Sequence, residues 1–264
     1  MTMARLKLTL AYVGTAYAGW QMQAESQKKS TIQKELEDAL RSIAGSPVRV
    51  HGAGRTDSGV HAEGQVAHAD VPDKPVDWRR ALNAKLPLDI RVLKAEPVSP
   101  AFHARHDATG KLYAYAVHTG PGPVHPRLEP FVCALPSLDI PAMERTAALL
   151  TGRHDFASFQ NAGTPLADTV RELWSVRYEP GLAGPFRCPP EWSPDGLVGT
   201  WFFHGNGFLK QMVRNLMGLL IWAGQGRTAP ETAAVFLAAK DRRALPSPTA
   251  PARGLTLMRV EYRG

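Results

Sequence analysis

The stretch RLKLTLAY, residues 5–12, alternates polar and apolar side chains, with leucine or tyrosine at every second position. Such alternation predicts a β-strand with one buried face. A helical pattern of apolar residues follows over residues 32–43. Ser30 and Gln33 have the spacing of a capping box before this helix, and Gly45 provides a stop after it. The chain therefore begins with a strand followed by a helix.

The same kinds of pattern continue along the rest of the chain. In the first half they predict further strands at 48–50, 65–68 and 90–95 and a helix that begins near Asp77. In the second half they predict strands at 111–118, 170–178, 197–203 and 255–262. They also predict helices at 139–150, with Asp139 as the cap, at 208–223 and at 230–240. Each half thus follows the order β-α-β-β-α-β of a ferredoxin-like unit, with one further helix before the last strand of the second half.

We therefore expect an α+β protein with an N-terminal half over 1–105 and a C-terminal half over 106–264. The two ferredoxin-like halves are predicted to form one largely antiparallel sheet, with helices on one face and a cleft on the other. A proline-rich stretch at 179–195 is longer than a simple hairpin connection requires, and the sequence assigns it no role.

Composition narrows the class of protein. The 264 residues include 31 Lys and Arg against 24 Asp and Glu, a net charge of +7 that favours a polyanionic partner. Two cysteines exclude a disulfide scaffold and a four-cysteine zinc site. The N-terminus has no signal-peptide pattern, and the longest apolar stretch, 216–223, is too short to cross a bilayer. A cytoplasmic protein without membrane contact is expected.

The densest group of reactive side chains is the glycine-rich loop GAGRTDSGVHA, residues 52–62. Its glycines allow tight turns and the close approach of a ligand. Asp57 lies beside Arg55 within this loop, and a carboxylate so placed can act as a nucleophile. An aspartate in a turn also commonly caps its own backbone, so the loop alone leaves both roles open.

The segment GRTDSGVHA, residues 54–62, resembles the catalytic loop of the tRNA pseudouridine synthase A family. Other segments resemble that family in the same order along nearly the whole chain. They are YVGTAYAGWQ (12–21), FHAR (102–105), KLYAY (111–115), GRHDFASF (152–159), MVRNLMG (212–218) and GLTL (254–257). A match of this extent is far more specific than a single short motif.

The resemblance implies a role for each matching site residue. Asp57 is the nucleophile that acts on a flipped-out uridine, and Arg55 takes part in flipping the base. Tyr113 stacks on that base and accepts its C5 proton, Arg214 forms an ion pair with Asp57, and Leu255 lines the base pocket. Without the resemblance, sheet packing is the favoured role of Tyr113, and a core position in a strand is at least as good a role for Leu255. Arg214 then lies either at the edge of a helical stripe or buried and paired. The residues leave open whether Asp57 attacks C6 or C1′, or whether a glycal path applies.

The resemblance also implies the substrate and the assembly. These are uridines 38, 39 and 40 of the tRNA anticodon stem-loop and a homodimer in which one tRNA spans both subunits. Because the reaction is an internal rearrangement, it needs no cofactor and no metal. Scattered basic residues are candidates for contact with the RNA, whose A-form surface is read mainly by shape. They are Arg5, Lys7, Lys28, Lys29, Arg79, Arg80, Lys85, Arg105, Lys111, Arg153 and Lys210.

Two other functions fit part of the sequence. A non-catalytic RNA-binding module would also use ferredoxin-like halves with aromatic residues on strands. Asp57-Ser58-Gly59 matches the signature of a dimeric aspartic protease, but the signature occurs once and the basic charge has no role there. A metal hydrolase is disfavoured because His103 and His106 have no third ligand at matching spacing.

Overall fold

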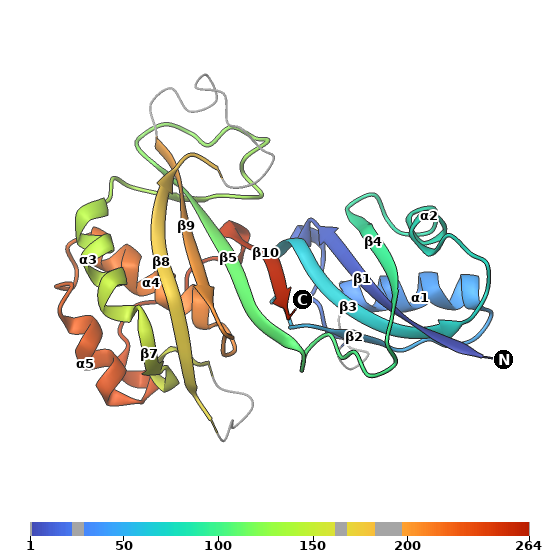
Figure 1. Ribbon diagram of the computed structural model, residues 1–264. Coiled ribbons are helices and arrows are strands. Elements are labelled where there is room, and N and C mark those ends of the chain that lie inside the picture. The colour runs from blue at the N-terminus through green and yellow to red at the C-terminus, as the bar shows by residue number, and fades with distance from the viewer. Residues whose placement is uncertain (1, 23–28, 162–167, 183–196, 264) are drawn as a thin grey trace. The chain divides into compact units, whose positions relative to one another are not determined.

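The computed structural model describes residues 2–22, 29–161, 168–182 and 197–263. The chain forms two compact units, Met1–Thr109 with Thr256–Gly264, and Gly110–Leu255. Each unit combines largely antiparallel strands with α-helices (Figure 1). This arrangement confirms the predicted α+β class.

The N-terminal unit is built on strands in the order β4-β1-β3-β10. Strand β3 pairs antiparallel with β1 and β2, whereas β10 pairs with β3 in parallel through Thr256–His61 and Leu257–Ala62. The last strand of the chain therefore completes the sheet of the first unit. The bounds are β1 Met3–Tyr12, β2 Val50–Gly52, β3 His61–Pro72, β4 Ile90–Val98 and β10 Leu255–Tyr262.

Two helices belong to this unit, α1 (Ile32–Ala44) and α2 (Trp78–Asn83). Helix α1 ends at Gly45, whose φ of 80° suits glycine, as predicted. The predicted capping box at Ser30 is wrong, because the side chain of Thr31 accepts the hydrogen bond from the Lys34 amide instead. Gln33 turns away from the cap and donates through Nε2 to the carbonyl of Val50 at 3.2 Å.

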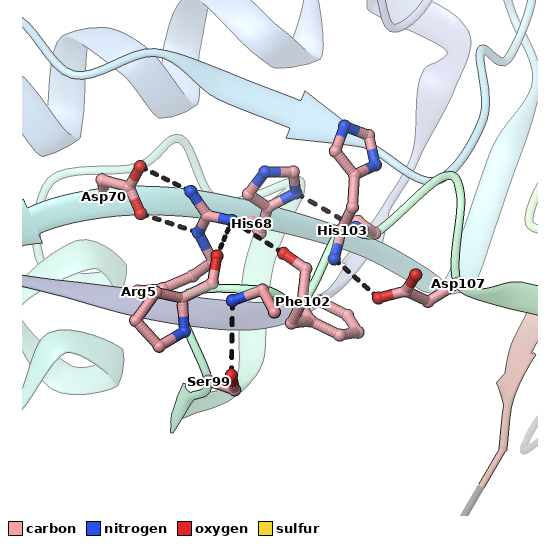
Figure 2. Close-up of polar contacts among 10 residues, drawn as sticks. Arg5, His68, Asp70, Ser99, Phe102, His103 and Asp107 are labelled. Atoms are coloured by element: carbon pink, nitrogen blue, oxygen red, sulfur yellow. Dashed lines mark hydrogen bonds and ion pairs between the residues drawn. The ribbon is translucent and has the colours of Figure 1, made fainter.

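The alternation in β1 separates two faces of the sheet. Leu6, Leu8 and Leu10 are buried, as predicted for a half-buried strand. On the polar face, the guanidinium of Arg5 binds both carboxylate oxygens of Asp70 at 2.7 and 2.8 Å. Arg5 also donates to the carbonyl of Phe102 at 3.0 Å, so the segment 99–107 lies against this face (Figure 2).

The C-terminal unit has strands in the order β5-β9-β8-β7, and β6 pairs in parallel with β5. The bounds of the strands are β5 Ala108–Thr119, β6 Cys133–Leu135, β7 Gly152–Asp155, β8 Val170–Pro180 and β9 Leu197–Gly205. Strands β6 and β7, which have only three and four residues, were not predicted.

Three helices, α3 (Ile140–Leu150), α4 (Met212–Gly224) and α5 (Thr232–Ala239), accompany this sheet (Figure 1). Asp139 caps α3 as predicted. Helix α4 begins four residues later than predicted, because Gln211 adopts a left-handed φ of 59° directly before it. In the part of the chain that the structure describes, no helix is long and apolar enough to cross a membrane.

Candidate active site

The glycine-rich loop of the N-terminal unit forms a tight turn around Asp57. The amide of Val60 donates to the carbonyl of Asp57 at 3.1 Å, and Gly59 inside the turn has a φ of 82°. Asp57 is half-buried, while Arg55 on one side and Ser58 on the other are exposed. The turn therefore presents a partly shielded carboxylate between two side chains that solvent reaches.

Thr56, the residue before Asp57, is anchored to its neighbours through both its side chain and its backbone. Its side chain is buried and hydrogen-bonds the hydroxyl of Tyr12 at 2.9 Å, while its carbonyl accepts from the amide of Trp20 at 3.0 Å. Gln65 donates from β3 to the carbonyl of Gly54 at 3.1 Å and to the Tyr12 hydroxyl at 3.4 Å. Burial raises the pKa of Tyr12 to about 12, which keeps its hydroxyl protonated. The backbone and the side chain of Thr56, directly before Asp57, are thus both held by hydrogen bonds.

The segment after β1 packs directly on the same turn. A Cβ atom at Gly19 would lie 2.6 Å from the carbonyl oxygen of Thr56 and 3.0 Å from the carbonyl carbon of Asp57. The φ of Gly19 is +95°, which also favours glycine. His61 is buried and accepts a hydrogen bond at Nδ1 from the amide of Gly14 at 3.1 Å. This contact gives His61 a structural role, because it ties the loop to the segment that follows β1.

The C-terminal unit holds the second group of predicted site residues. Tyr113 lies on β5 with its ring edge-to-face against Phe208, at a centroid distance of 5.1 Å. Tyr115, two residues on, is fully buried and donates to the carbonyl of Pro251 at 2.9 Å. Burial is the main cause that raises the pKa of the Tyr115 hydroxyl. The two tyrosines are therefore held in different ways, one by an aromatic contact and one by a hydrogen bond.

Arg214 lies in the first turn of α4 and is half-buried. Its Nε donates to the carbonyl of Ala250 at 2.8 Å, and the amide of Ala250 donates back to the carbonyl of Arg214 at 3.0 Å. Leu255 is buried just beyond this segment. The structure thus brings Tyr113, Arg214 and Leu255 into one unit and places Asp57 and Arg55 in the other. The Asp57–Arg214 ion pair stays a prediction.

The predicted RNA-binding side chains differ in exposure. Lys29, Arg79, Arg105 and Lys210 are exposed and Lys111 is half-buried. Lys28 and residues 183–195 of the proline-rich stretch lie outside the described residues. Among the residues that the structure describes, no group of three or more His, Cys, Asp or Glu side chains is arranged to hold a metal ion.

A cluster of imidazoles lies on the polar face of the N-terminal sheet, and the sequence patterns do not predict it. His68 on β3 stacks on His51 of β2 at 5.0 Å, and its ring centroid lies 4.7 Å from that of His103. Nδ1 of His68 accepts from the amide of Ala104 at 3.1 Å (Figure 2). This bond helps to hold the segment that carries Arg105. The only sequence signal was the position of His68 on the polar side of a strand.

A second missed residue is Asn215, directly after Arg214. It is fully buried within a helix whose other inward residues are apolar. A buried amide in such a stretch must find hydrogen-bond partners elsewhere in the fold. The amide in the sequence MVRNLMG signals this need, although the sequence does not show which segments satisfy it.

Comparison with known proteins identifies the class of protein to which this chain belongs. A family model described as tRNA pseudouridine synthase matches residues 9–107 and 146–263. These ranges include Asp57, Arg214 and Leu255 but not Tyr113.

The chain belongs to the tRNA pseudouridine synthase family and is therefore an isomerase, as predicted. It is 56% identical to the "tRNA pseudouridine synthase A" of Oleidesulfovibrio alaskensis, over 98% of this chain and 97% of that protein. It is 54% identical to the protein of that name from Solidesulfovibrio magneticus, over 98% and 92% of the two chains. Identity to the Chlamydia trachomatis protein of that name is 40%, over 98% and 92%.

Proposed function

We propose that this protein converts uridine to pseudouridine at positions 38, 39 and 40 of the tRNA anticodon stem-loop, with Asp57 as the nucleophile. The observation that carries the proposal is the Asp57 turn. Thr56 is held through its hydroxyl and its carbonyl, and Gly19 packs on the backbone of Asp57, while the carboxylate remains half-buried. A reacting group whose supports are rigid is held ready for attack, which is how enzymes reduce the entropic part of a barrier.

The chemistry suits a carboxylate. The target uridine leaves the helical stack before a side chain can reach it. Asp57 forms a covalent bond either to C1′ of the sugar or to C6 of the ring, and the bond between N1 and C1′ breaks. The ring then turns and joins C1′ through C5. The proton lost from C5 is balanced by the one gained at N1, and release of the adduct returns the carboxylate. No electron is gained or lost, and no other reactant is consumed.

The other predicted residues complete the proposal. Arg55, exposed beside the nucleophile, contacts the RNA backbone and helps to extrude the base. Tyr113 stacks on the extruded uracil and accepts the C5 proton, and Leu255 lines its pocket. Arg214 pairs with Asp57 during catalysis, since a nearby cation keeps a carboxylate ionised in a partly dry site. The net charge of +7 supports binding to a polyanion. The working enzyme is proposed to be a cytoplasmic homodimer.

The test is to incubate the protein with unmodified tRNA and to map pseudouridine at each nucleotide. The wild type should form product at positions 38–40. Asp57→Asn should bind tRNA with unchanged affinity and form none, whereas the matched control Asp73→Asn, at an exposed aspartate of the same unit, should keep full activity. Absence of product at these positions across many tRNAs would refute the proposed substrate. Binding without product by the wild type is the result expected of a non-catalytic module.

A further inference from the structure

We infer that Asn215 and Thr249 are positioning residues that hold the guanidinium of Arg214 for the reaction. The inference rests on the proposed function, in which Arg214 acts on the nucleophile. Neither residue need touch the substrate. Their effect is transmitted through the segment 248–250, which lies against the first half of α4.

Asn215 is the hub of a buried polar network. Its Nδ2 donates to the carbonyl of Phe159 at 2.8 Å and to Oδ1 of Asn161 at 2.9 Å. Its Oδ1 accepts from the hydroxyl of Thr249 at 2.7 Å and from Nη2 of Arg242 at 3.5 Å. A primary amide has two donor protons and two acceptor lone pairs, so all the capacity of this side chain is used. One residue thereby ties three separate segments to α4.

The segment 248–250 connects this hub to Arg214. A Cβ atom at Gly218 would lie 2.1 Å from the carbonyl oxygen of Pro248, so α4 needs a glycine there to let the segment approach. Thr249 is bonded to Asn215, and the next residue, Ala250, accepts the Nε–H of Arg214 at 2.8 Å. That hydrogen bond restrains the guanidinium of Arg214 at its Nε. A shift of Thr249 therefore shifts Arg214.

Asn161, which is hydrogen-bonded to Asn215, is itself held by two further side chains. Oδ1 of Asn161 accepts from Nε of Arg242 at 3.0 Å, and its Nδ2 donates to Oε1 of Gln211. Gln211 has a left-handed φ of 59° at the start of α4, a conformation that costs energy in a residue other than glycine. The segment that contains Phe159 and Asn161 thus braces the residues around Arg214, which gives the GRHDFASF resemblance at 152–159 a structural purpose.

The exact position of the Arg214 guanidinium affects the reaction rate more than the overall stability of the fold does. An arginine side chain has several rotatable bonds, and a small displacement of a catalytic group lowers the rate steeply. Thr249→Val removes one hydrogen bond to Asn215, while the new side chain has almost the same shape as threonine. The expected effect is on the chemical step rather than on tRNA affinity.

The experiment compares Thr249→Val with Thr249→Ser and with a control, Thr146→Val. Thr146 is a buried threonine of the same unit whose hydroxyl donates at 2.9 Å to Ala142, within α3. We expect Thr249→Val to lower the single-turnover rate of pseudouridine formation roughly tenfold, with tRNA affinity unchanged. Thr249→Ser, which keeps the hydroxyl, and Thr146→Val should retain the wild-type rate. Thermal unfolding of each variant establishes that it is folded.

An epistasis measurement separates positioning from general stabilisation. In the background Arg214→Lys, which keeps the charge but not the guanidinium, Thr249→Val should cost less than about twofold, because residues that act through one another are not additive. Multiplicative losses, or equal rates for Thr249→Val and Thr146→Val, would overturn the inference alone. A wild-type rate for Arg214→Lys would overturn the role of Arg214 and this inference with it. A wild type that forms no pseudouridine would instead refute the proposed function.

Discussion

Lowering the pH should destabilise this protein through His68. The ring is only 3% exposed, and Nδ1 accepts the amide of Ala104 at 3.1 Å, which requires that nitrogen to carry no proton. Burial is the largest cause that lowers the pKa of His68, to about 4, and the neighbouring His103, Arg5 and His51 lower it further. Asp70 is the one neighbour that acts in the opposite direction. The folded state therefore strongly prefers the neutral ring.

The sign and size follow from this pKa. In the unfolded chain the pKa of a histidine is about 6.5. Between pH 6.5 and pH 4 the unfolded state then binds more protons than the folded state, so the free energy of unfolding falls as the pH falls. The difference of about 2.5 between the two pKa values corresponds to about 3 kcal/mol. This stability is fully present above pH 6.5 and is lost as the pH falls toward 4.

Denaturant unfolding at a series of pH values from 7 to 4 measures the effect. The comparison variant is His68→Asn, whose amide oxygen can accept the Ala104 N–H but does not titrate. The free energy of unfolding of the wild type should fall by about 3 kcal/mol more than that of the variant over this range. Titrating groups that do not interact with His68 are common to both proteins and cancel in the difference, whereas His103, His51 and Asp70 face His68 and contribute to it. Parallel pH curves for the two proteins would refute the reasoning.

Three further predictions concern the supports of the two site groups. Gly19→Ala should lower the single-turnover rate and destabilise the protein by about 1–3 kcal/mol, because its Cβ would lie 2.6 Å from the Thr56 carbonyl oxygen; an unchanged rate would contradict this. Tyr12→Phe should reduce the free energy of unfolding by about 1–3 kcal/mol, since it leaves buried polar partners unsatisfied; an unchanged denaturant midpoint would count against it. Gly218→Ala should lower the rate without weakening tRNA binding, because it displaces Pro248; wild-type kinetics would argue the opposite.

Local patterns predicted the parts of the fold that depend on near neighbours. The alternation of residues 5–12, the helix stop at Gly45, the helix start near Asp77 and the cap at Asp139 are all present. The capping box at Ser30 was wrong because Ser30 and Thr31 are chemically similar neighbours, and the packing of Gln33 against Val50 decides between them. The start of α4 was misplaced because nothing in its apolar sequence reveals the left-handed Gln211.

In the candidate site, too, sequence motifs predicted some features and only the folded structure shows the others. The resemblance pointed to Asp57, Tyr113 and Arg214, because these residues lie in short recognisable motifs. It could not reveal how Tyr12 and Gln65 hold the turn, or how Asn215 reaches Phe159 and Thr249. The contacts that Tyr12 and Asn215 make here join residues that are 34–56 positions apart and that share no sequence pattern. Whether such groups meet depends on strand register and helix packing.

The sequence by itself thus determined the α+β class, the order of the main elements, the basic charge and the family. These properties arise from side-chain periodicity, composition and motifs, which are local. Only the tertiary structure decided that the last strand joins β3 of the N-terminal unit, that His68 is buried among other imidazoles, and that Asn215 braces the segment beside Arg214. The physical reason is that a hydrogen bond such as that from Tyr262 to Ala104 spans 158 positions, and folding alone brings such partners together.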